Sequence, residues 1–367
     1  MKKNTKTIAY VATIILLAQL GIADAESTKV VTPSQVVQDC KAYDIEVQID
    51  NMESNLKRLR AAYTPSGAGL GGGPWAITYR LSIAPLFSDI QQKADDFQIA
   101  NEQMNNEYLY YDNAYKYWLL SQTARYKLEN LSLSQHERDM TKKKLELGLA
   151  SQTELLQAEI SVNNAQSDFD KINLQKQNQM YQINQTMGSA ADTPLNVDSE
   201  DLSFLSADEL NVDQTLINLY QTHRSLESLK ALLEANQKAQ SIAAGQTDIN
   251  VPAQNLIDYY NLEIEEAQLK LKQQRQRLEI ASRSYLEQAK TLESAIKLDQ
   301  DNVEKVKKVY DNSVKTFELG MITYSEMESV RMKLLATNLQ LSSDQKDYLT
   351  LKEKLKLFKS GALFTIL

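Results

Sequence analysis

Long stretches of this sequence place apolar residues three and four positions apart, the spacing of a helix that buries one face. Between 151 and 187 the apolar positions predict a coiled-coil seam made of Leu155, Ala158, Val162, Ala165, Phe169 and Ile172. A less regular seam recurs between 323 and 359, at Met327, Val330, Leu334, Thr337 and Leu341. The pattern predicts a mainly helical protein.

Glycines, prolines and capping residues divide the pattern into two halves joined by a linker over 189–205. In the first half, 26–188, we expect helices over 32–63, 88–147 and 151–187. A short strand region over 64–87 precedes the second of these, because large apolar residues alternate from Trp75 to Ile83. In the second half, 206–361, we expect helices over 206–244, 252–319 and 323–359, followed by a tail over 362–367.

One motif occurs twice and relates the halves to each other. Residues 145–158 read LELGLASQTELLQA, and residues 317–330 read FELGMITYSEMESV. In each copy a glycine suits the left-handed position that ends a helix, and a hydroxyl residue followed three positions later by Glu starts the next one. So short a turn predicts an antiparallel helical hairpin in each half.

Helix lengths indicate how the pieces stack. The helix over 88–147 spans roughly 90 Å at 1.5 Å per residue, much longer than its antiparallel partner over 151–187. The helix over 32–63 has the right length to stack end-on to that partner, and the second half repeats the arrangement. A helix this long leaves an apolar stripe uncovered in one copy, so we expect several copies to associate.

The first 25 residues resemble an export signal. Lys2, Lys3 and Lys6 precede an apolar run, and Ala23-Asp24-Ala25 fits a cleavage site, although an uncleaved anchor is the alternative. The net charge is −8 with both signs interspersed, and no concentrated basic patch indicates nucleic-acid binding. The single cysteine, Cys40, excludes an internal disulfide.

Catalytic and metal-binding patterns are absent from the sequence. His136 and His223 lack a cysteine or carboxylate at metal-ligand spacing, so we interpret both as surface or packed residues. No nucleophile–base pair is evident, and we expect neither an enzyme nor a cofactor. Tyr108, Tyr110, Tyr111, Tyr115, Tyr117 and Trp118 could form a sugar or membrane-interface surface, but helical spacing favours packing.

Several segments together resemble the TolC family of outer-membrane efflux channels. They are Ala84-Pro85-Leu86-Phe87, the run from Ala114 to Leu120, the two glycine turns, and Tyr348 to Leu357. The resemblance implies a homotrimer whose tandem hairpins form a helical cylinder in the periplasm, ending in a barrel in the outer membrane. It also implies docking to a periplasmic adaptor (membrane-fusion) protein and an inner-membrane transporter.

The resemblance also implies sites at the glycine turns. The adaptor-docking positions map to Gly148, Leu149, Ser151, Thr153, Gly320, Met321, Thr323 and Ser325. An acidic constriction of the pore maps to Glu326. The alternative is that Glu154 and Glu326 serve only as capping residues, and both roles can coexist.

The strand-forming segments depart from the family. A strand needs about 9–11 residues to cross a bilayer; the region 64–87 offers one such strand and 245–251 has no room for a pair. We therefore predict TolC-like tandem hairpins with a reduced or absent β-barrel portion. The alternative function is that of an exported structural or adaptor coiled-coil protein that lacks a membrane-spanning barrel.

Overall fold

The structure is a computed structural model that describes residues 30–43, 73–247 and 253–364. The predicted export signal over 1–25 lies outside the described residues. So do most of the predicted helix over 32–63 and the glycine-rich part of the predicted strand region.

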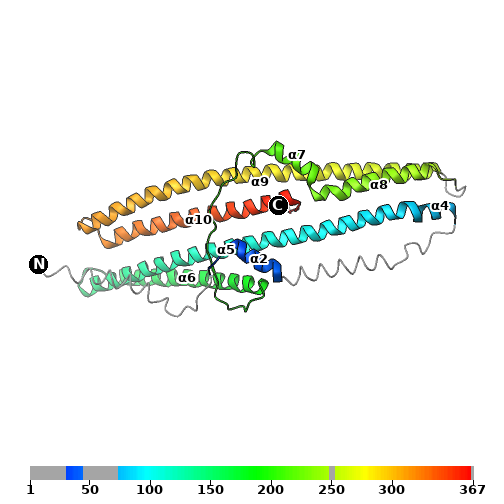
Figure 1. The fold of residues 1–367 in the computed structure, drawn as a ribbon. Coiled ribbons are helices and arrows are strands. Elements are labelled where there is room, and N and C mark those ends of the chain that lie inside the picture. Colours follow the sequence, from blue (N-terminus) through cyan, green and yellow to red (C-terminus); the bar gives the residue numbers. More distant parts are fainter. Residues whose placement is uncertain (1–29, 44–72, 248–252, 365–367) are drawn as a thin grey trace.

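Two long antiparallel hairpins make up most of the molecule (Figure 1). The first consists of α5 (Ala84–Glu146) and α6 (Gln152–Thr186), and the second of α9 (Ala253–Glu318) and α10 (Tyr324–Ser360). At 63 and 66 residues, α5 and α9 are the longest helices of the described chain, as predicted. Because α5 also packs against α10, the four helices form one layer in the order α6, α5, α10, α9.

Shorter helices extend each hairpin at the end away from its turn. The helix α2 (Pro33–Tyr43) packs on α5, and α8 (Glu227–Ala244) packs on α9. The ring of Tyr43 fills the space beside Gly188, where a Cβ atom would clash with it. The described part of the first short helix therefore meets the end of α6, as the predicted end-on stacking requires.

The linker between the halves crosses the long helices near their middle (Figure 1). It contains β2 (Asn196–Val197), which pairs in parallel with β1 (Val30–Val31). The Tyr117 hydroxyl of α5 donates to the Leu195 carbonyl at 2.6 Å, and the Leu205 amide donates to the Tyr348 hydroxyl of α10 at 2.7 Å. The linker is thus bound to both hairpins.

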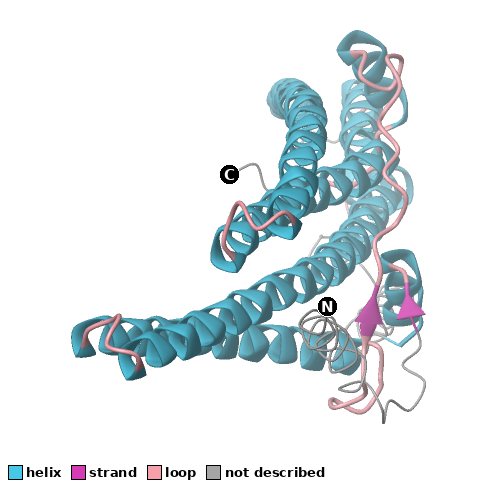
Figure 2. Cartoon of the chain, turned by 90° about the vertical axis from the view of Figure 1, so that its left-hand side faces the viewer, coloured by secondary structure: helices cyan, strands magenta, loops and turns pink. Residues whose placement is uncertain are grey.

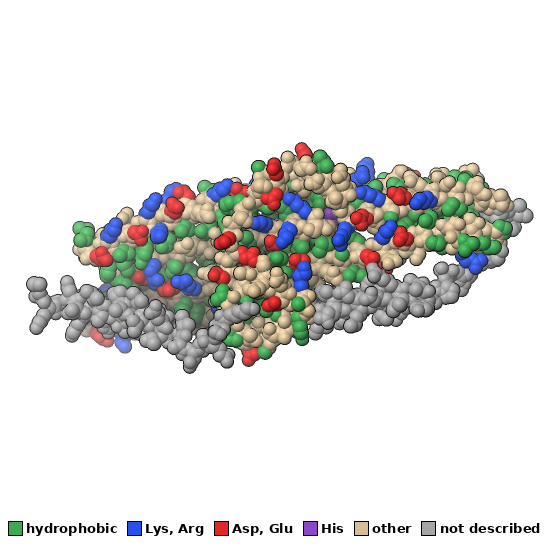
Figure 3. Space-filling view, viewed as in Figure 1, with side chains coloured by type: hydrophobic (Ala, Val, Ile, Leu, Met, Phe, Trp, Pro, Cys, Tyr) green, Lys and Arg blue, Asp and Glu red, His purple; other side chains and the backbone are tan. Residues whose placement is uncertain are grey.

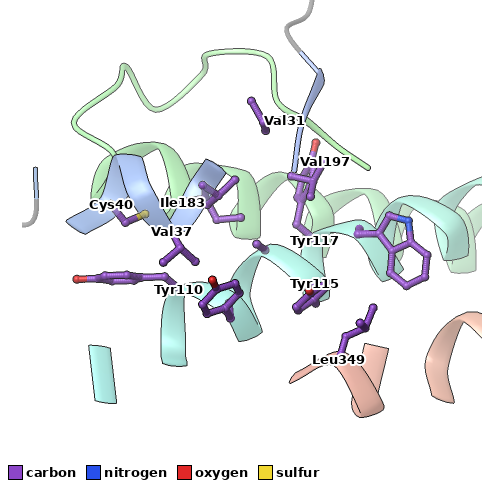
Figure 4. Packing of buried hydrophobic residues seen from close by; sticks show 13 residues of the cluster. Val31, Val37, Cys40, Tyr110, Tyr115, Tyr117, Ile183, Val197 and Leu349 are labelled. Carbon is purple, nitrogen blue, oxygen red and sulfur yellow. The ribbon is translucent and has the colours of Figure 1, made fainter. Parts of the chain in front are cut away.

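Tyrosines from the middle of α5 build the core beneath this linker (Figure 4). Tyr115 is buried, and its hydroxyl donates to the Glu200 carboxylate at 3.1 Å. Burial, with Glu200 adding to it, raises the pKa of the Tyr115 phenol. The interpretation of the aromatic run as packing is confirmed for its members Tyr110, Tyr111, Tyr115, Tyr117 and Trp118.

The prediction of a strand from Trp75 to Ile83 is wrong. The segment is helical, as α4 (Pro74–Thr78) and the π-helical turn η1 (Tyr79–Ile83), and runs directly into α5. Pro85 lacks an amide hydrogen and its ring disfavours the normal α-helical approach to the Leu81 carbonyl, so a wider turn before it is a physical solution. The apolar alternation misled the prediction because this helix carries apolar residues on two faces.

The prediction of one continuous helix over 206–244 is also wrong. Ser206 and Glu209 form the expected reciprocal hydrogen bonds, at 2.9 and 3.3 Å, but they close only a turn. The helix α7 (Val212–Thr222) begins after that turn, and a 3₁₀ turn η2 (Arg224–Leu226) separates it from α8. The break falls at His223, whose ring accepts from the Ser225 amide at 3.3 Å.

None of the helices within the described ranges is both long enough and apolar enough to cross a bilayer.

Candidate functional site: the hairpin tips

The two glycine turns end their helices in the same way. Gly148 has φ 72° and Gly320 has φ 71°, the left-handed region that favours glycine. The Leu149 amide donates back to the Lys144 carbonyl at 2.7 Å, and the Met321 amide to the Thr316 carbonyl at 3.0 Å. These bonds satisfy carbonyls that the helix ends leave free, so backbone geometry accounts for both glycines.

Both predicted capping boxes are present. The Glu154 carboxylate accepts from the Ser151 amide at 2.6 Å, and that of Glu326 from the Thr323 amide at 2.7 Å. The hydroxyls of Ser151 and Thr323 accept in return from the amides of the two glutamates. The backbone hydrogen bond, helped by the hydroxyl, lowers the pKa of each carboxyl, so both carry a negative charge at neutral pH.

Large apolar side chains flank each glycine and project into solvent. They are Leu147, Leu149, Leu319 and Met321, which are 73%, 74%, 71% and 74% exposed. We call residues 147–154 and 319–326 the hairpin tips. Exposed apolar groups gathered on a rigid turn are typical of a surface that binds a protein partner.

Leu147 and Leu319 were missed by the sequence reasoning, which named only the residues at and after each glycine. The signal was available, because the two leucines align with each other in the repeated motif. A large apolar residue directly before a helix-ending glycine has little to pack against within its own hairpin.

Both tips lie at the same end of the molecule, which Figure 2 shows facing the viewer. The second tip contacts α5 through two residues. The Ser325 hydroxyl donates to the Glu137 carboxylate at 2.8 Å, and the ring centroids of Tyr324 and His136 lie 4.6 Å apart. Thr153 is exposed on the first turn of α6. The structure therefore brings the predicted tip residues to one end, and uses Ser325 to join the hairpins.

An ion-pair network reinforces this junction. Arg331 of α10 forms an ion pair with Glu328 of the same helix at 2.8 Å. It forms a second ion pair with Glu129 of α5 at 2.9 Å. Burial alone would lower the pKa of the Arg331 guanidinium, but the two carboxylates more than offset it and the pKa is raised. Sequence patterns did not predict this network, because the first repeat has Glu159 at the position of Arg331.

The exposed groups of the tips are suited to binding a partner and not to catalysing a reaction. Their polar groups are engaged in capping the helices or in joining them, and their exposed atoms are largely apolar. No group of His, Cys, Asp and Glu residues in the described ranges is arranged to hold a metal ion.

The fold resembles several solved structures. It is similar to the CmeC outer membrane channel of Campylobacter jejuni, with a TM-score of 0.65 and 9% identity, covering 93% of this chain and 91% of that chain. The outer membrane protein VceC of Vibrio cholerae gives a TM-score of 0.64 and 10% identity over 90% of this chain and 96% of that one. The structure of CusC, whose description names transmembrane channel formation, gives a TM-score of 0.64 and 12% identity. The match covers 92% of this chain and 94% of that chain.

Sequence comparisons add no match. No protein-family model matches this chain, and no curated protein does. The similarity is therefore one of fold, and in each comparison it extends over at least 90% of both chains. The chain has a TolC-like fold, with two tandem helical hairpins whose turns lie at one end.

Proposed function

We propose that this chain is a TolC-like efflux or secretion channel component of the outer membrane. Three copies form a helical conduit in the periplasm, and their tips dock with an adaptor protein and, through it, an inner-membrane transporter. Transport through such a conduit needs no catalysis by the chain itself. The conduit opens at its tip when packed hairpins untwist.

One observation carries this proposal: the fold shared with outer-membrane channels ends in two matched turns that expose four large apolar side chains. A protein conduit must join its neighbour end to end, and apolar groups on rigid turns lose little conformational entropy when they are buried by a partner. The duplication multiplies the docking positions, because a trimer would present six such turns.

Glu326 gives the proposed conduit a charged group near its entrance. Its carboxylate is held by Thr323 and is ionised at neutral pH. An ionised ring of three such carboxylates would favour cations over anions in a narrow pore. We therefore propose that Glu326 both caps α10 and constricts the pore.

A second candidate function is that of an exported structural or adaptor coiled-coil protein. The observation that favours it is the helical state of Trp75 to Ile83, which lengthens α5 at the end away from the tips. A molecule of this kind would act as a spacer between envelope components and would conduct nothing.

The docking proposal is tested by cross-linking the purified chain to the adaptor protein of the same cell. We expect Leu149→Glu together with Met321→Glu to reduce the cross-linked yield at least tenfold, because charges would replace buried apolar contacts. Ile217→Glu, on an exposed position of α7, serves as the control and should leave the yield unchanged. Normal docking by the tip variant, with helicity intact, would remove the tips as the partner site.

A further inference from the structure

A groove lies where the linker meets the first hairpin. Its volume is about 440 Å³, within the range of pockets that hold small organic molecules. It lies toward the end of α6 that is away from the tip, so it is separate from the proposed docking site. The residues that line it include Tyr117 of α5, Asn173, Lys176 and Met180 of α6, and Pro194 and Leu195 of the linker.

Hydrogen bonds hold the walls of this groove in place. Tyr117 is buried, and its hydroxyl, which donates to the Leu195 carbonyl, fixes α5 to the linker (Figure 4). The buried Asn184 side chain donates to the carbonyls of Ala191 and Thr193 at 3.0 and 2.7 Å, which fixes the linker directly after α6. A ligand would therefore meet a preformed surface, and little conformational entropy would be lost when it binds.

Lys176 supplies the only charge among the described residues that line the groove. Its ammonium lies 5.7 Å from the centre of the Tyr117 ring, and burial lowers its pKa. Elsewhere on the same hairpin Lys127 pairs with Asp168 at 2.7 Å, and Figure 3 shows basic and acidic side chains interspersed along the helices. Within the described ranges no carboxylate forms an ion pair with Lys176, so it is a half-buried cation that lacks a counter-ion there.

We propose that this groove binds a small organic anion that has a flat apolar body. The carboxylate or sulfonate of the ligand accepts hydrogen bonds from Lys176, with the Asn173 amide as a second donor. The apolar body lies on Met180, Pro194 and Leu195, which removes apolar surface from water on both sides. Because partial burial disfavours the charged form of a lysine, an anion beside Lys176 recovers part of that cost.

A second copy of the chain is a less suitable occupant of this groove. In the proposed trimer a neighbouring copy would cover the exposed apolar residues of α6, which include Leu174. Lys176 lies two residues further along, which is about 200° around a helix of 3.6 residues per turn. The groove therefore faces away from the edge that a neighbouring copy would cover. The inference goes beyond the proposed function, because neither docking at the tips nor conduction requires this site.

The test is calorimetric titration of the purified mature chain with 1-naphthoate, an aromatic carboxylate. We expect saturable binding of one molecule per chain. Lys176→Met keeps an apolar stem over Tyr117 but removes the charge, so it should weaken binding at least tenfold, whereas Lys176→Arg should retain most of the affinity. Lys171→Met is the matched control, because it removes an exposed lysine from another face of α6, and it should leave the affinity unchanged.

A neutral probe, 1-naphthamide, separates the charge from the apolar body. It should bind the unmodified chain at least tenfold more weakly than 1-naphthoate does, and Lys176→Met should not weaken its binding further. Absence of saturable 1-naphthoate binding to the unmodified chain would overturn the proposal, and so would equal losses in Lys171→Met and Lys176→Met. A Lys176→Met variant that binds 1-naphthoate normally but no longer forms the trimer would also overturn it, since the groove would then be an interface between copies.

Discussion

At the scale of single residues, the two tip glycines are required by backbone conformation and not by lack of space. A Cβ atom at Gly148 or Gly320 would have no other atom within 4 Å. Gly148→Ala or Gly320→Ala should therefore lower the free energy of unfolding by about 1–2 kcal/mol through left-handed backbone strain alone. Thermal denaturation followed by circular dichroism measures the change.

Gly245 provides the matched control for this prediction. It also ends a helix, α8, but its φ of −91° is accessible to any residue, and a Cβ atom there would make an ordinary contact at 3.7 Å. Gly245→Ala should leave stability unchanged or raise it slightly. Equal effects at all three glycines would show that the tip backbone is not strained by a side chain.

His223 should make the protein sensitive to acid. It is 1% exposed, and burial lowers the pKa of its ring from 6.5 to about 4, although backbone groups of Ala362 and Phe358 act in the opposite direction. Because the unfolded chain takes up a proton that the folded chain excludes, stability is full above pH 6.5. It should fall by on the order of 3 kcal/mol between pH 6.5 and pH 4.

Denaturant unfolding at several pH values tests this prediction. His223→Asn keeps a hydrogen-bond acceptor for the Ser225 amide and removes the titrating ring. The variant should be less stable at pH 7, because it leaves a cavity, but its stability should depend less on pH in this range. An unchanged slope in the variant would assign the acid sensitivity to other groups.

At the scale of elements, Arg331 joins the two hairpins near the tips. Replacing it with methionine would leave Glu328, which is buried, without its partner. Because the Arg331 side chain is partly exposed, we expect a loss on the order of 2 kcal/mol, between the values for surface and buried pairs. Glu129→Gln, which removes the more exposed partner, should cost clearly less. A larger loss for Glu129→Gln would mean that the contact between hairpins dominates.

The elements that the sequence predicted correctly have strong local signals. The turns at Gly148 and Gly320 combine a helix-ending glycine with a capping box, and both contacts form within one turn of chain. The seam of α6 was also predicted correctly, because Ala165 is buried and the other seam positions are half-buried. Such signals depend on a few adjacent residues.

The elements that were missed depend on distant partners. Trp75 to Ile83 is helical because one of its faces packs on α8 and α9, which period-two alternation cannot reveal. The break at His223 carries no glycine or proline and is made by a histidine side chain that binds the backbone two residues later. At the site, Leu149 and Met321 were named through the family resemblance, whereas the bridge from Arg331 to Glu129 required the hairpins to be placed side by side.

At the scale of the whole molecule, the layer of four helices has two open edges. The outer helices are α6 and α9, and each exposes large apolar residues: Leu156, Ile160 and Leu174 on α6, and Leu262, Leu269, Ile280, Leu298 and Val309 on α9. Joining the α6 edge of one copy to the α9 edge of the next would cover both and would close a cylinder. We therefore predict that the mature chain sediments as a trimer, and a stable monomer would contradict closure.

A closed cylinder is useful for transport only if it conducts, so conductance tests the central claim most directly. The mature chain should be reconstituted into planar bilayers at a concentration at which sedimentation shows the trimer. We predict discrete single-channel steps whose preference for cations falls in Glu326→Gln. A trimer that binds the bilayer but gives no conductance steps would contradict the channel and favour the structural coiled-coil function.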